Sequence, residues 1–566
     1  MSSAATETYA GRRSRRSPLL VRKAAVLGAG AMGSGIAAHL ANAGIPSLLL
    51  DMVPAEITED ERKKGLDLSH PLVRNRLALK GIESARKGRL PGFAHESRVD
   101  LVTPGNLEDD LAALAEVDWV VEAVVERLDV KTTLLREVAR HLSSRAVLST
   151  NTSGLSVNAM AAALPESVRP RFFGTHFFNP PRYMRLLELV PAAQTAEEPL
   201  AAFHEFAEHR LGKGVVRAKD TPNFVANRIG VFATVYAMWA METHGLTVEG
   251  VDAVTGKALG RAPTATFGTA DLAGLDILAN AVRTHSEGAP DDEQHDLVCL
   301  PAWVASMAER GLVGNKSGGG FYTERRQKVI DPQTLEYRPR RDPAYPSLAE
   351  AAQAREAGER VARLIQAGDA AGRFAWDVTA ATLLYAAHRV PEIAEDIADI
   401  DRAMRWGYAW ELGPFELWDA LGLPATLRRM ADEGRQVPMW VRVLAGSNAP
   451  SFYLRERGVV RAYDHPARGY RPPPPRPRQI VLSDFRRAGR TLLESKDAAL
   501  VDLGDGVACL EFRTKMNVVS EGVLTFVRQV LERGGTGYQA LVIGNQGPLF
   551  LSGRGPDGHV FPCCRP

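Results

Sequence analysis

A histidine and a glutamate on two neighbouring apolar runs could act together on a proton. His176 lies in the run 172–180 and Glu188 in the run 185–190. Histidine titrates near neutral pH, so it can remove the hydroxyl proton when an alcohol gives up a hydride. A carboxylate bonded to the far ring nitrogen would fix the tautomer and stabilise the imidazolium. Taken singly, each has a structural interpretation: a histidine satisfied in the core, and a glutamate on an edge strand.

Polar side chains that could bind a substrate oxygen gather around this pair. We expect all of them in turns, or at a helix start, near one end of a sheet: Asn151, Ser153, Asn179 and Asn227. Strand ends followed by polar turns are where open α/β sheets bind their ligands. These residues strengthen the catalytic interpretation of His176 and Glu188.

A glycine-rich turn near the start of the chain has the spacing of a dinucleotide site. The turn, Gly28, Gly30, Met32 and Gly33, follows the apolar run 24–27 and opens a helix-like segment. The glycines allow a sharp turn, a close approach of backbone N–H groups to a pyrophosphate, and tight helix–strand packing. Asp51, after a second apolar run, can accept hydrogen bonds from ribose hydroxyls and would repel a 2′-phosphate, which favours NAD over NADP. The structural alternative is a plain βαβ unit.

The elements that must position these residues alternate between strand and helix. Apolar runs at 119–125 and 146–149 flank an expected helix at about 128–142, and a polar turn follows at 150–153. This alternation predicts an α/β Rossmann-type, doubly wound sheet over residues 21–218. Residues 1–20 are expected to form a disordered basic tail, with an organelle transit peptide as the alternative, because the leader has arginines but no apolar core.

From residue 219 the pattern becomes helical and repeats. Residues 251–254 with 269–276 are echoed by 400–404 with 414–419. We therefore expect an all-helical domain of two repeats, 219–330 and 331–462. The proline-rich stretch 463–480 predicts a stiff linker. Beyond it, residues 481–566 predict a partial α/β segment with strands at 498–503, 507–512 and 540–543 and a helix at 520–532.

Composition narrows the function class. The chain has 566 residues, a formal charge of +2 and 45% hydrophobic residues, so neither nucleic acid nor a membrane surface is indicated as a partner. No apolar run is long enough for a membrane span. The four cysteines show no metal-ligand spacing and no disulfide framework, which favours a reducing, cytoplasmic location without a bound metal.

A cluster of basic residues follows Asp51. It predicts either a solvated helical hairpin or a clasp for a phosphate-bearing substrate arm. The cluster comprises Lys63, Lys64, Arg74, Arg76, Lys80, Arg86, Lys87 and Arg89.

Five motifs together resemble the L-3-hydroxyacyl-CoA dehydrogenases of fatty-acid β-oxidation. In chain order they are GAGAMGSGIA, VEAVVERLDVK, STNTSGLS, GTHFFNPPRYMRLLELV and KDTPNFVANRIG. The likeness runs from about Lys23 to Asp276, and the helical repeat extends it to about Gly422. It is strongest to bacterial fusion proteins in which this dehydrogenase precedes an enoyl-CoA hydratase (crotonase-like) domain.

The resemblance implies NAD-dependent oxidation of an L-3-hydroxyacyl-CoA to the 3-ketoacyl-CoA. His176 would be the general base and Glu188 its orienting partner. Ser153 and Asn227 would bind the substrate 3-oxygen, with Asn179 supporting the site. Further residues would border the cofactor: Glu126, Lys131 and Asn151. The basic cluster falls where the family's CoA-contacting helices lie, which favours the clasp.

The resemblance also has departures and open points. Asn223 stands where many members have glycine, and we expect a local backbone effect there. Residues 510–517 and 540–546 resemble the oxyanion-hole strands of crotonase-like hydratases, but 549–555 match poorly and no catalytic carboxylates follow. We therefore expect a truncated segment without hydratase activity, from a frameshift or a truncation. The alternatives are a non-catalytic nucleotide-binding protein and a bifunctional enzyme; the expected partners are an acyl-CoA and either a second copy or a thiolase.

Overall fold

The computed structural model describes residues 19–456, 459–472, 480–533, 537–546, 551–554 and 560–563. Two compact units make up the chain, Met1–Pro450 and Ser451–Pro566. The expected basic tail lies almost entirely outside the described residues. Within them, no helix combines the length and the apolar character that crossing a bilayer requires.

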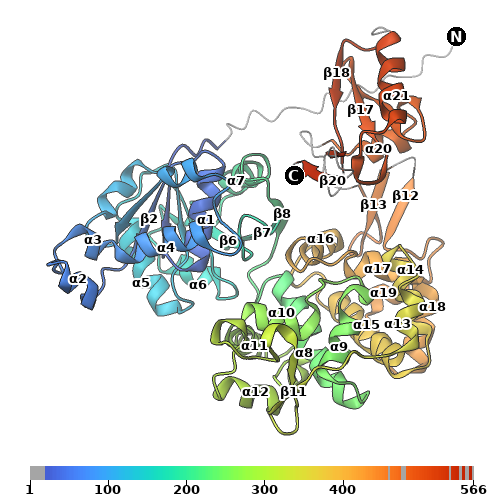
Figure 1. Ribbon diagram of the computed structural model, residues 1–566, viewed down its shortest axis with the longest axis horizontal. Helices are drawn as coiled ribbons and strands as arrows, with labels where there is room; N and C mark the ends of the chain where they lie inside the picture. The colour runs from blue at the N-terminus through green and yellow to red at the C-terminus, as the bar shows by residue number, and fades with distance from the viewer. Residues whose placement is uncertain are drawn as a thin grey trace. The chain divides into compact units, whose positions relative to one another are not determined.

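An eight-stranded sheet forms the first half of the larger unit (Figure 1). Its order is β3-β2-β1-β4-β5-β6-β7-β8. Neighbouring strands are parallel except β6 and β7, which are antiparallel. The order reverses between β1 and β4, so the predicted doubly wound sheet is confirmed. The strands are β1 (Ala24–Leu27), β2 (Ser47–Asp51), β3 (Val102–Asn106), β4 (Trp119–Glu122), β5 (Val147–Thr150), β6 (Phe172–Phe177), β7 (Leu186–Pro191) and β8 (Gly214–Arg217).

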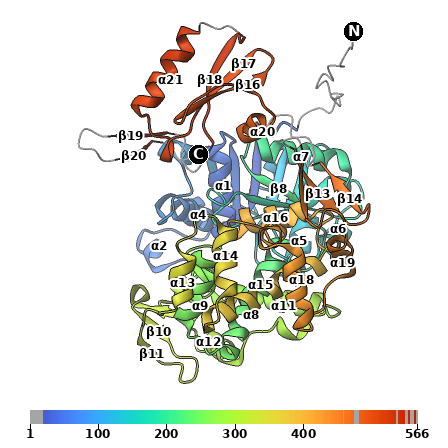
Figure 2. The ribbon, with the colours of Figure 1, turned by 90° about the vertical axis from the view of Figure 1, so that its right-hand side faces the viewer.

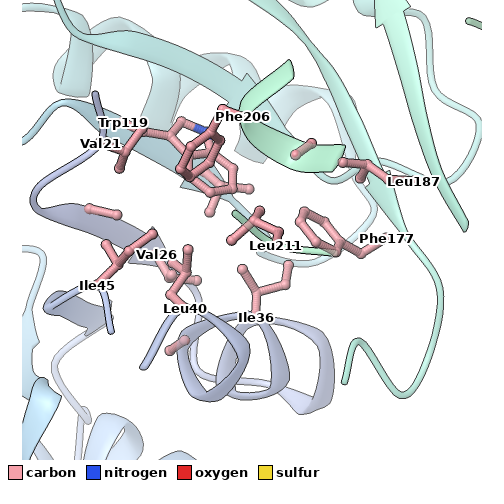
Figure 3. Close-up of a cluster of buried hydrophobic side chains, with 14 of the residues drawn as sticks. Val21, Val26, Ile36, Leu40, Ile45, Trp119, Phe177, Leu187, Phe206 and Leu211 are labelled. Carbon is pink, nitrogen blue, oxygen red and sulfur yellow. The ribbon is translucent and has the colours of Figure 1, made fainter. Parts of the chain in front are cut away.

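Helices between the strands bury the sheet. Trp119 on β4 packs edge-on against Phe203 of α7, with ring centroids 4.9 Å apart, and Ile36 and Leu40 of α1 join the same core (Figure 3). Burial of these large apolar side chains holds the helices in place. The helices are α1 (Ala31–Asn42), α2 (Glu59–Lys63), α3 (Pro71–Arg74), α4 (Arg76–Lys87), α5 (Leu128–Ala139), α6 (Val157–Ala162) and α7 (Glu197–His209).

The second half of this unit is helical, as predicted. A first set of helices ends in a small three-stranded sheet, and a second set follows. The first set is α8 (Ala226–Thr243), α9 (Val248–Thr255), α10 (Ala265–Ala273), α11 (Leu275–Gly288), α12 (Ala302–Glu309), β9 (Tyr322–Thr323), β10 (Lys328–Ile330) and β11 (Tyr337–Pro339). The second set is α13 (Pro346–Ala351), α14 (Ala357–Gln366), α15 (Ala370–His388), α16 (Ile397–Gly407), α17 (Pro414–Leu421), α18 (Leu423–Asp432) and α19 (Met439–Ala445).

The internal repeat is visible in equivalent hydrogen bonds. Asp252 on α9 accepts the backbone N–H groups of Phe267 and Gly268 at the start of α10. Asp401 on α16 accepts those of Phe415 and Glu416 at the start of α17. In both copies a carboxylate satisfies amides that a helix start leaves free. These bonds support the reading of the two segments as copies of one helical unit.

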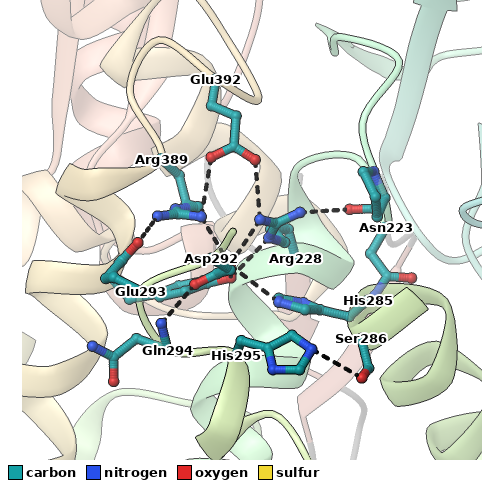
Figure 4. Close-up of polar contacts among 12 residues, drawn as sticks. Asn223, Arg228, His285, Ser286, Asp292, Glu293, Gln294, His295, Arg389 and Glu392 are labelled. Carbon is teal, nitrogen blue, oxygen red and sulfur yellow. Dashed lines mark hydrogen bonds and ion pairs between the residues drawn. The ribbon is translucent and has the colours of Figure 1, made fainter. Parts of the chain in front are cut away.

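A buried ion cluster ties the two helical sets together (Figure 4). Asp292 accepts hydrogen bonds from Arg228 on α8, at 2.7 Å, and from Tyr385 on α15, at 2.8 Å. Arg389, just beyond α15, also bonds to Asp292, and Glu392 bridges both arginines at 3.0 Å. Because Arg228 is fully buried, it needs these partners. The cluster anchors the start of α8.

The described residues of the unit Ser451–Pro566 form a three-stranded, a four-stranded and a two-stranded sheet. Helix α21 packs on one face of the larger sheet, β15-β16-β17-β18 (Figure 2). The strands and helix expected at 498–503, 507–512, 520–532 and 540–543 are confirmed. The elements are β12 (Tyr453–Glu456), β13 (Val459–Asp464), β14 (Gly469–Arg471), α20 (Leu482–Arg487), β15 (Thr491–Glu494), β16 (Ala498–Gly504), β17 (Val507–Phe512), α21 (Glu521–Glu532), β18 (Ala540–Ile543), β19 (Leu551–Arg554) and β20 (Val560–Cys563).

The expected linker at 463–480 begins inside a sheet. Its first residues belong to β13 and to β14, which ends at Arg471. Tyr463 on β13 lies opposite Tyr470 on β14. Their rings meet edge to face at 5.5 Å, an apolar contact that the proline-rich composition further on concealed. Residues 473–479, which hold most of the prolines, lie outside the described residues.

Candidate active site

His176 and Glu188 form a direct cross-strand pair. Antiparallel pairing of β6 with β7 sets them opposite each other, and Nδ1 of His176 lies 2.6 Å from Oε2 of Glu188. Opposed residues of antiparallel strands have their Cβ atoms close together, so a short imidazole–carboxylate contact is sterically natural. His176 is 5% exposed and Glu188 is fully buried. The structure therefore brings together the two residues singled out from the sequence.

The second oxygen of Glu188 joins the sheet to the helical part. Oε1 accepts the N–H of Ala226 at 2.8 Å and that of Val225 at 3.2 Å, where α8 begins. A helix N-terminus carries unpaired N–H groups and partial positive charge, which suits a carboxylate. Glu188 thus orients His176 with one oxygen and fixes the start of α8 with the other.

Aromatic rings enclose the imidazole. The ring of Phe178 lies 4.5 Å from that of His176, centroid to centroid, and the ring of Phe224 lies 5.7 Å away. With Nδ1 engaged by Glu188, Nε2 is the ring nitrogen left to exchange a proton with a substrate. The arrangement can act as a general base oriented by a carboxylate.

Asn151 and Asn227 lie beside this pair. Oδ1 of Asn151 accepts the N–H of Phe177, the residue after His176, at 2.9 Å, which ties the end of β5 to the end of β6. Asn227 is the second residue of α8, and its Oδ1 accepts the hydroxyl of Tyr408 at 3.1 Å. Sequence reasoning missed Tyr408, because it lies 181 positions from its partner and carries no local motif.

A buried carboxylate–lysine network shapes the loops after β4 and β5. Lys131, 1% exposed, donates to Glu122 at 2.7 Å and lies 3.2 Å from Glu126. Glu126 in turn accepts the Thr152 hydroxyl at 2.6 Å and the Ser153 N–H at 2.7 Å. The ammonium of Lys131 therefore lies beneath the loops after β4 and β5, and it holds the carboxylate that positions residues 152 and 153. Glu122, which is fully buried, was not anticipated from the sequence.

The three glycines of the turn differ in the space around them. Gly28 has φ +100°, and a Cβ there would lie 2.6 Å from the carbonyl oxygen of Ala123. A Cβ on Gly33 would overlap the carbonyl oxygen of Gly28, whereas one on Gly30 would meet nothing within 4 Å. Only the middle glycine faces open space, where backbone N–H groups at the start of α1 can approach a ligand.

Asp51 and Met32 support this turn from two sides. Oδ2 of Asp51 accepts the N–H of Ala29 at 2.6 Å, so the acidic residue braces the turn. Met32 packs against the apolar core beneath α1. The turn is thus braced by a hydrogen bond and by apolar packing.

A cavity of about 580 Å³ adjoins the turn. Its walls are the first turns of α1, a side of α4 that includes Lys80, and the loop after β6 with Asn179 and Arg182. Arg182 donates to the carbonyl oxygens of Pro91 and Phe93, which fastens this loop to the segment after α4. Asn179 therefore faces the cavity near the glycine turn.

Of the eight residues in the basic cluster after Asp51, four form ion pairs within the part of the chain that the structure describes and four do not. Four members form ion pairs: Arg74 with Glu108 and Asp109, Arg76 with Glu61, Arg86 with Glu83 and Glu96, and Lys87 with Glu83. Among the described residues, Lys80 has no ion pair, and it alone of the cluster lines the cavity. Lys63, Lys64 and Arg89 are exposed.

Asn223 adopts a left-handed backbone conformation, with φ +64°. Asparagine tolerates this region better than other residues with a side chain, although glycine adopts it most easily. Its side chain donates to the carbonyl oxygen of Ala281 at 2.8 Å. The local backbone effect expected at this position therefore takes the form of a turn that leads into α8.

Comparison with known families assigns the sheet half of the larger unit and the first set of helices that follows it. Residues 23–221 match the family model described as "3-hydroxyacyl-CoA dehydrogenase, NAD binding domain", and residues 224–324 match "3-hydroxyacyl-CoA dehydrogenase, C-terminal domain". The glycine turn, Asp51 and the His176–Glu188 pair all fall within the first match.

Individual relatives agree with these matches. A Bacillus subtilis protein named "Probable 3-hydroxyacyl-CoA dehydrogenase" is 42% identical over 94% of this chain and 67% of its own length. A Pseudomonas syringae protein named "Fatty acid oxidation complex subunit alpha" is 32% identical over 56% of this chain and 41% of its own length. The crystal structure of 3-hydroxybutyryl-CoA dehydrogenase from Escherichia coli K12 shares the fold, with a TM-score of 0.53 at 24% identity, over 74% of this chain and 96% of that one.

Proposed function

The chain belongs to the 3-hydroxyacyl-CoA dehydrogenase family, an NAD-dependent family, and we propose that it oxidises an L-3-hydroxyacyl-CoA to the 3-ketoacyl-CoA. The observation that carries this proposal is the 2.6 Å contact between His176 and Glu188, which joins a general base to its orienting carboxylate. The reaction is reversible, and we assign it to fatty-acid oxidation.

Each residue of the site has a defined task in this reaction. His176 takes the proton from the substrate hydroxyl through Nε2, and Glu188 stabilises the imidazolium that forms. Ser153 and Asn227 hold the 3-oxygen, and Asn179 supports the site. NAD supplies the acceptor for the hydride that leaves C3. The aromatic rings around His176 keep bulk water from the imidazole.

The residues around the glycine turn fit NAD. The open position at Gly30 leaves room for phosphates at the N-terminus of α1, and Asp51 lies at the end of β2, where it can accept ribose hydroxyls. A 2′-phosphate would meet the Asp51 carboxylate as a like charge. Asn151, Glu126 and Lys131 are proposed to order the loops on the nicotinamide side.

The phosphate-bearing arm of the acyl-CoA is proposed to lie against α4. Lys80 is the member of the basic cluster that lines the cavity, and among the described residues it has no ion pair to break. An ammonium in this state can bind a phosphate at little cost. The paired members of the basic cluster, such as Arg74 and Arg76, serve the fold instead.

A spectrophotometric assay of the full chain tests the proposal. NADH oxidation is followed with 3-ketoacyl-CoAs of several chain lengths, and hydration of an enoyl-CoA is followed in parallel. We expect NADH loss and no hydration. Nucleotide binding without NADH loss would favour the alternative of a non-catalytic nucleotide-binding protein. Measurable hydration would show that residues 481–566 complete a second active site. Sedimentation of the chain alone and with a thiolase tests the two expected partners.

A further inference from the structure

The second helical repeat reaches into the candidate active site through one tyrosine. Tyr408 directly follows α16, and its hydroxyl donates to Oδ1 of Asn227 at 3.1 Å. Asn227 belongs to the first turn of α8, in the first repeat. Tyr408 lies beyond residue 324, where the matched family models end, so its role cannot be carried over from them.

The end of α16 is seated closely on the strand that carries Glu188. A Cβ on Gly407 would lie 2.6 Å from Cδ2 of Leu186, two residues before Glu188 on β7. Trp406 packs against Gly214 on β8, and the guanidinium of Arg185 lies 4.6 Å above its ring. These contacts fix the backbone from which Tyr408 extends.

The ring of Tyr408 packs directly on Gly230 of α8. A Cβ on Gly230 would lie 2.1 Å from Cζ of Tyr408, so any side chain at position 230 would displace the ring. Gly230 follows Asn227 by three positions and therefore lies on the same face of the helix, one turn on. The ring covers this face, and its hydroxyl meets the amide of Asn227.

We propose that Tyr408 is a positioning residue for the dehydrogenase reaction. By donating to Oδ1 of Asn227, it fixes the amide so that the Nδ2–H groups remain for the 3-oxygen of the substrate. The inference rests on the proposed role of Asn227. It gives the second helical repeat a part in catalysis in addition to its packing role.

The surroundings of the Tyr408 hydroxyl keep it protonated, so it can serve as a hydrogen-bond donor throughout the reaction. Burial and the nearby carboxylate of Glu188 both raise the pKa of Tyr408 above its ordinary value. The phenol therefore stays protonated through the neutral range, and it keeps donating to Asn227 while His176 changes its charge.

The test compares Tyr408→Phe with the control Tyr236→Phe. Tyr236 lies on α8, nine positions beyond Asn227, and its hydroxyl makes a second hydrogen bond between the repeats, to Asp377 at 2.9 Å. For Tyr408→Phe we expect kcat with a 3-ketoacyl-CoA to fall about tenfold, the value of one hydrogen bond, with the KM for NADH and the melting temperature unchanged. Tyr236→Phe should keep the wild-type kcat.

Two further variants separate positioning from packing. Asn227→Ala combined with Tyr408→Phe should lose no more than Asn227→Ala alone, because both changes remove the same oriented amide. Gly230→Ala should reproduce the loss of kcat by displacing the ring. An unchanged kcat in Tyr408→Phe, or additive losses in the double variant, would overturn the role of Tyr408 while the proposed function stood. A wild-type chain that neither binds nor reduces a 3-ketoacyl-CoA would overturn both.

Discussion

His176 and Glu188 face each other across the antiparallel pair β6–β7 in a sheet whose other neighbouring strands run parallel, and their side chains meet at 2.6 Å. The reversal of β7 is what sets the carboxylate beside the imidazole. The second carboxylate oxygen of Glu188 holds the N–H of Ala226, so one residue links the sheet, the base and the helical domain.

Replacement of Glu188 by glutamine separates its two tasks. The amide oxygen can still accept the N–H groups of α8, but the charge that stabilises the imidazolium is gone. We expect kcat to fall by about 10²- to 10⁴-fold, with a melting temperature close to wild type. Steady-state kinetics and thermal unfolding measure both, with Glu198→Gln on the exposed side of α7 as the control. A kcat equal to that of wild type would show that the carboxylate serves the fold only.

Asp51 should decide between the two nicotinamide cofactors. Asp51→Asn keeps an oxygen for the N–H of Ala29 but removes the negative charge at the end of β2. The preference for NADH over NADPH, measured as the ratio of kcat/KM values, should fall by about tenfold or more, because the repulsion of the 2′-phosphate is lost. If the ratio stayed unchanged, a residue other than Asp51 would discriminate between the ribose hydroxyl of NADH and the 2′-phosphate of NADPH.

Lys131 should contribute strongly to stability. Lys131→Met leaves Glu122 buried without its cation, which costs about 3–5 kcal/mol of unfolding free energy. The exposed pair of Lys316 with Asp276 is a matched control, and its loss through Lys316→Met should cost about 1 kcal/mol or less. Urea titrations of both variants give the comparison. Equal small losses would mean that the buried carboxylate finds another partner.

Lys213 should make stability depend on pH in the alkaline range. It is 5% exposed, it donates to the carbonyl oxygens of Pro181 and Met184, and burial lowers its pKa to about 8. The unfolded chain keeps this proton to about pH 10.5, so it holds more protons than the folded chain between the two values, and stability rises with pH there.

The matched comparison is wild type against Lys213→Met across that window. Relative to the variant, wild type should gain about 3 kcal/mol from pH 8 to pH 10.5, measured by urea unfolding at a series of pH values. Parallel curves for the two proteins would contradict the lowered pKa.

The sequence indicated the site better than it indicated the edges of the sheet. β1, β4, β6 and β7 are largely apolar, because they lie inside the sheet and are buried on both faces. β3 contains Pro104 and Gly105, and it and the short β8 are the outermost strands, where such residues are tolerated. Neither edge strand was anticipated.

Contacts across long stretches of the chain could not be predicted from local patterns. The basic cluster near α4 gave no sign of which of its members form ion pairs, because the partners of Arg74 lie 34 and 35 positions further on. Tyr408 was missed for the same reason. By contrast, Asp401 and Asp252 could be matched in advance, because the repeat places them within similar short segments.

The most direct measurement of the central claim is the turnover of His176→Gln with a 3-ketoacyl-CoA and NADH. Glutamine keeps a polar side chain of similar reach but cannot exchange a proton. We expect kcat to fall by about 10²- to 10⁴-fold, while NADH binding, measured by fluorescence titration, matches that of wild type and of the half-buried control His141→Gln, which lies just after α5. A kcat within tenfold of wild type would contradict the assignment of His176 as the general base.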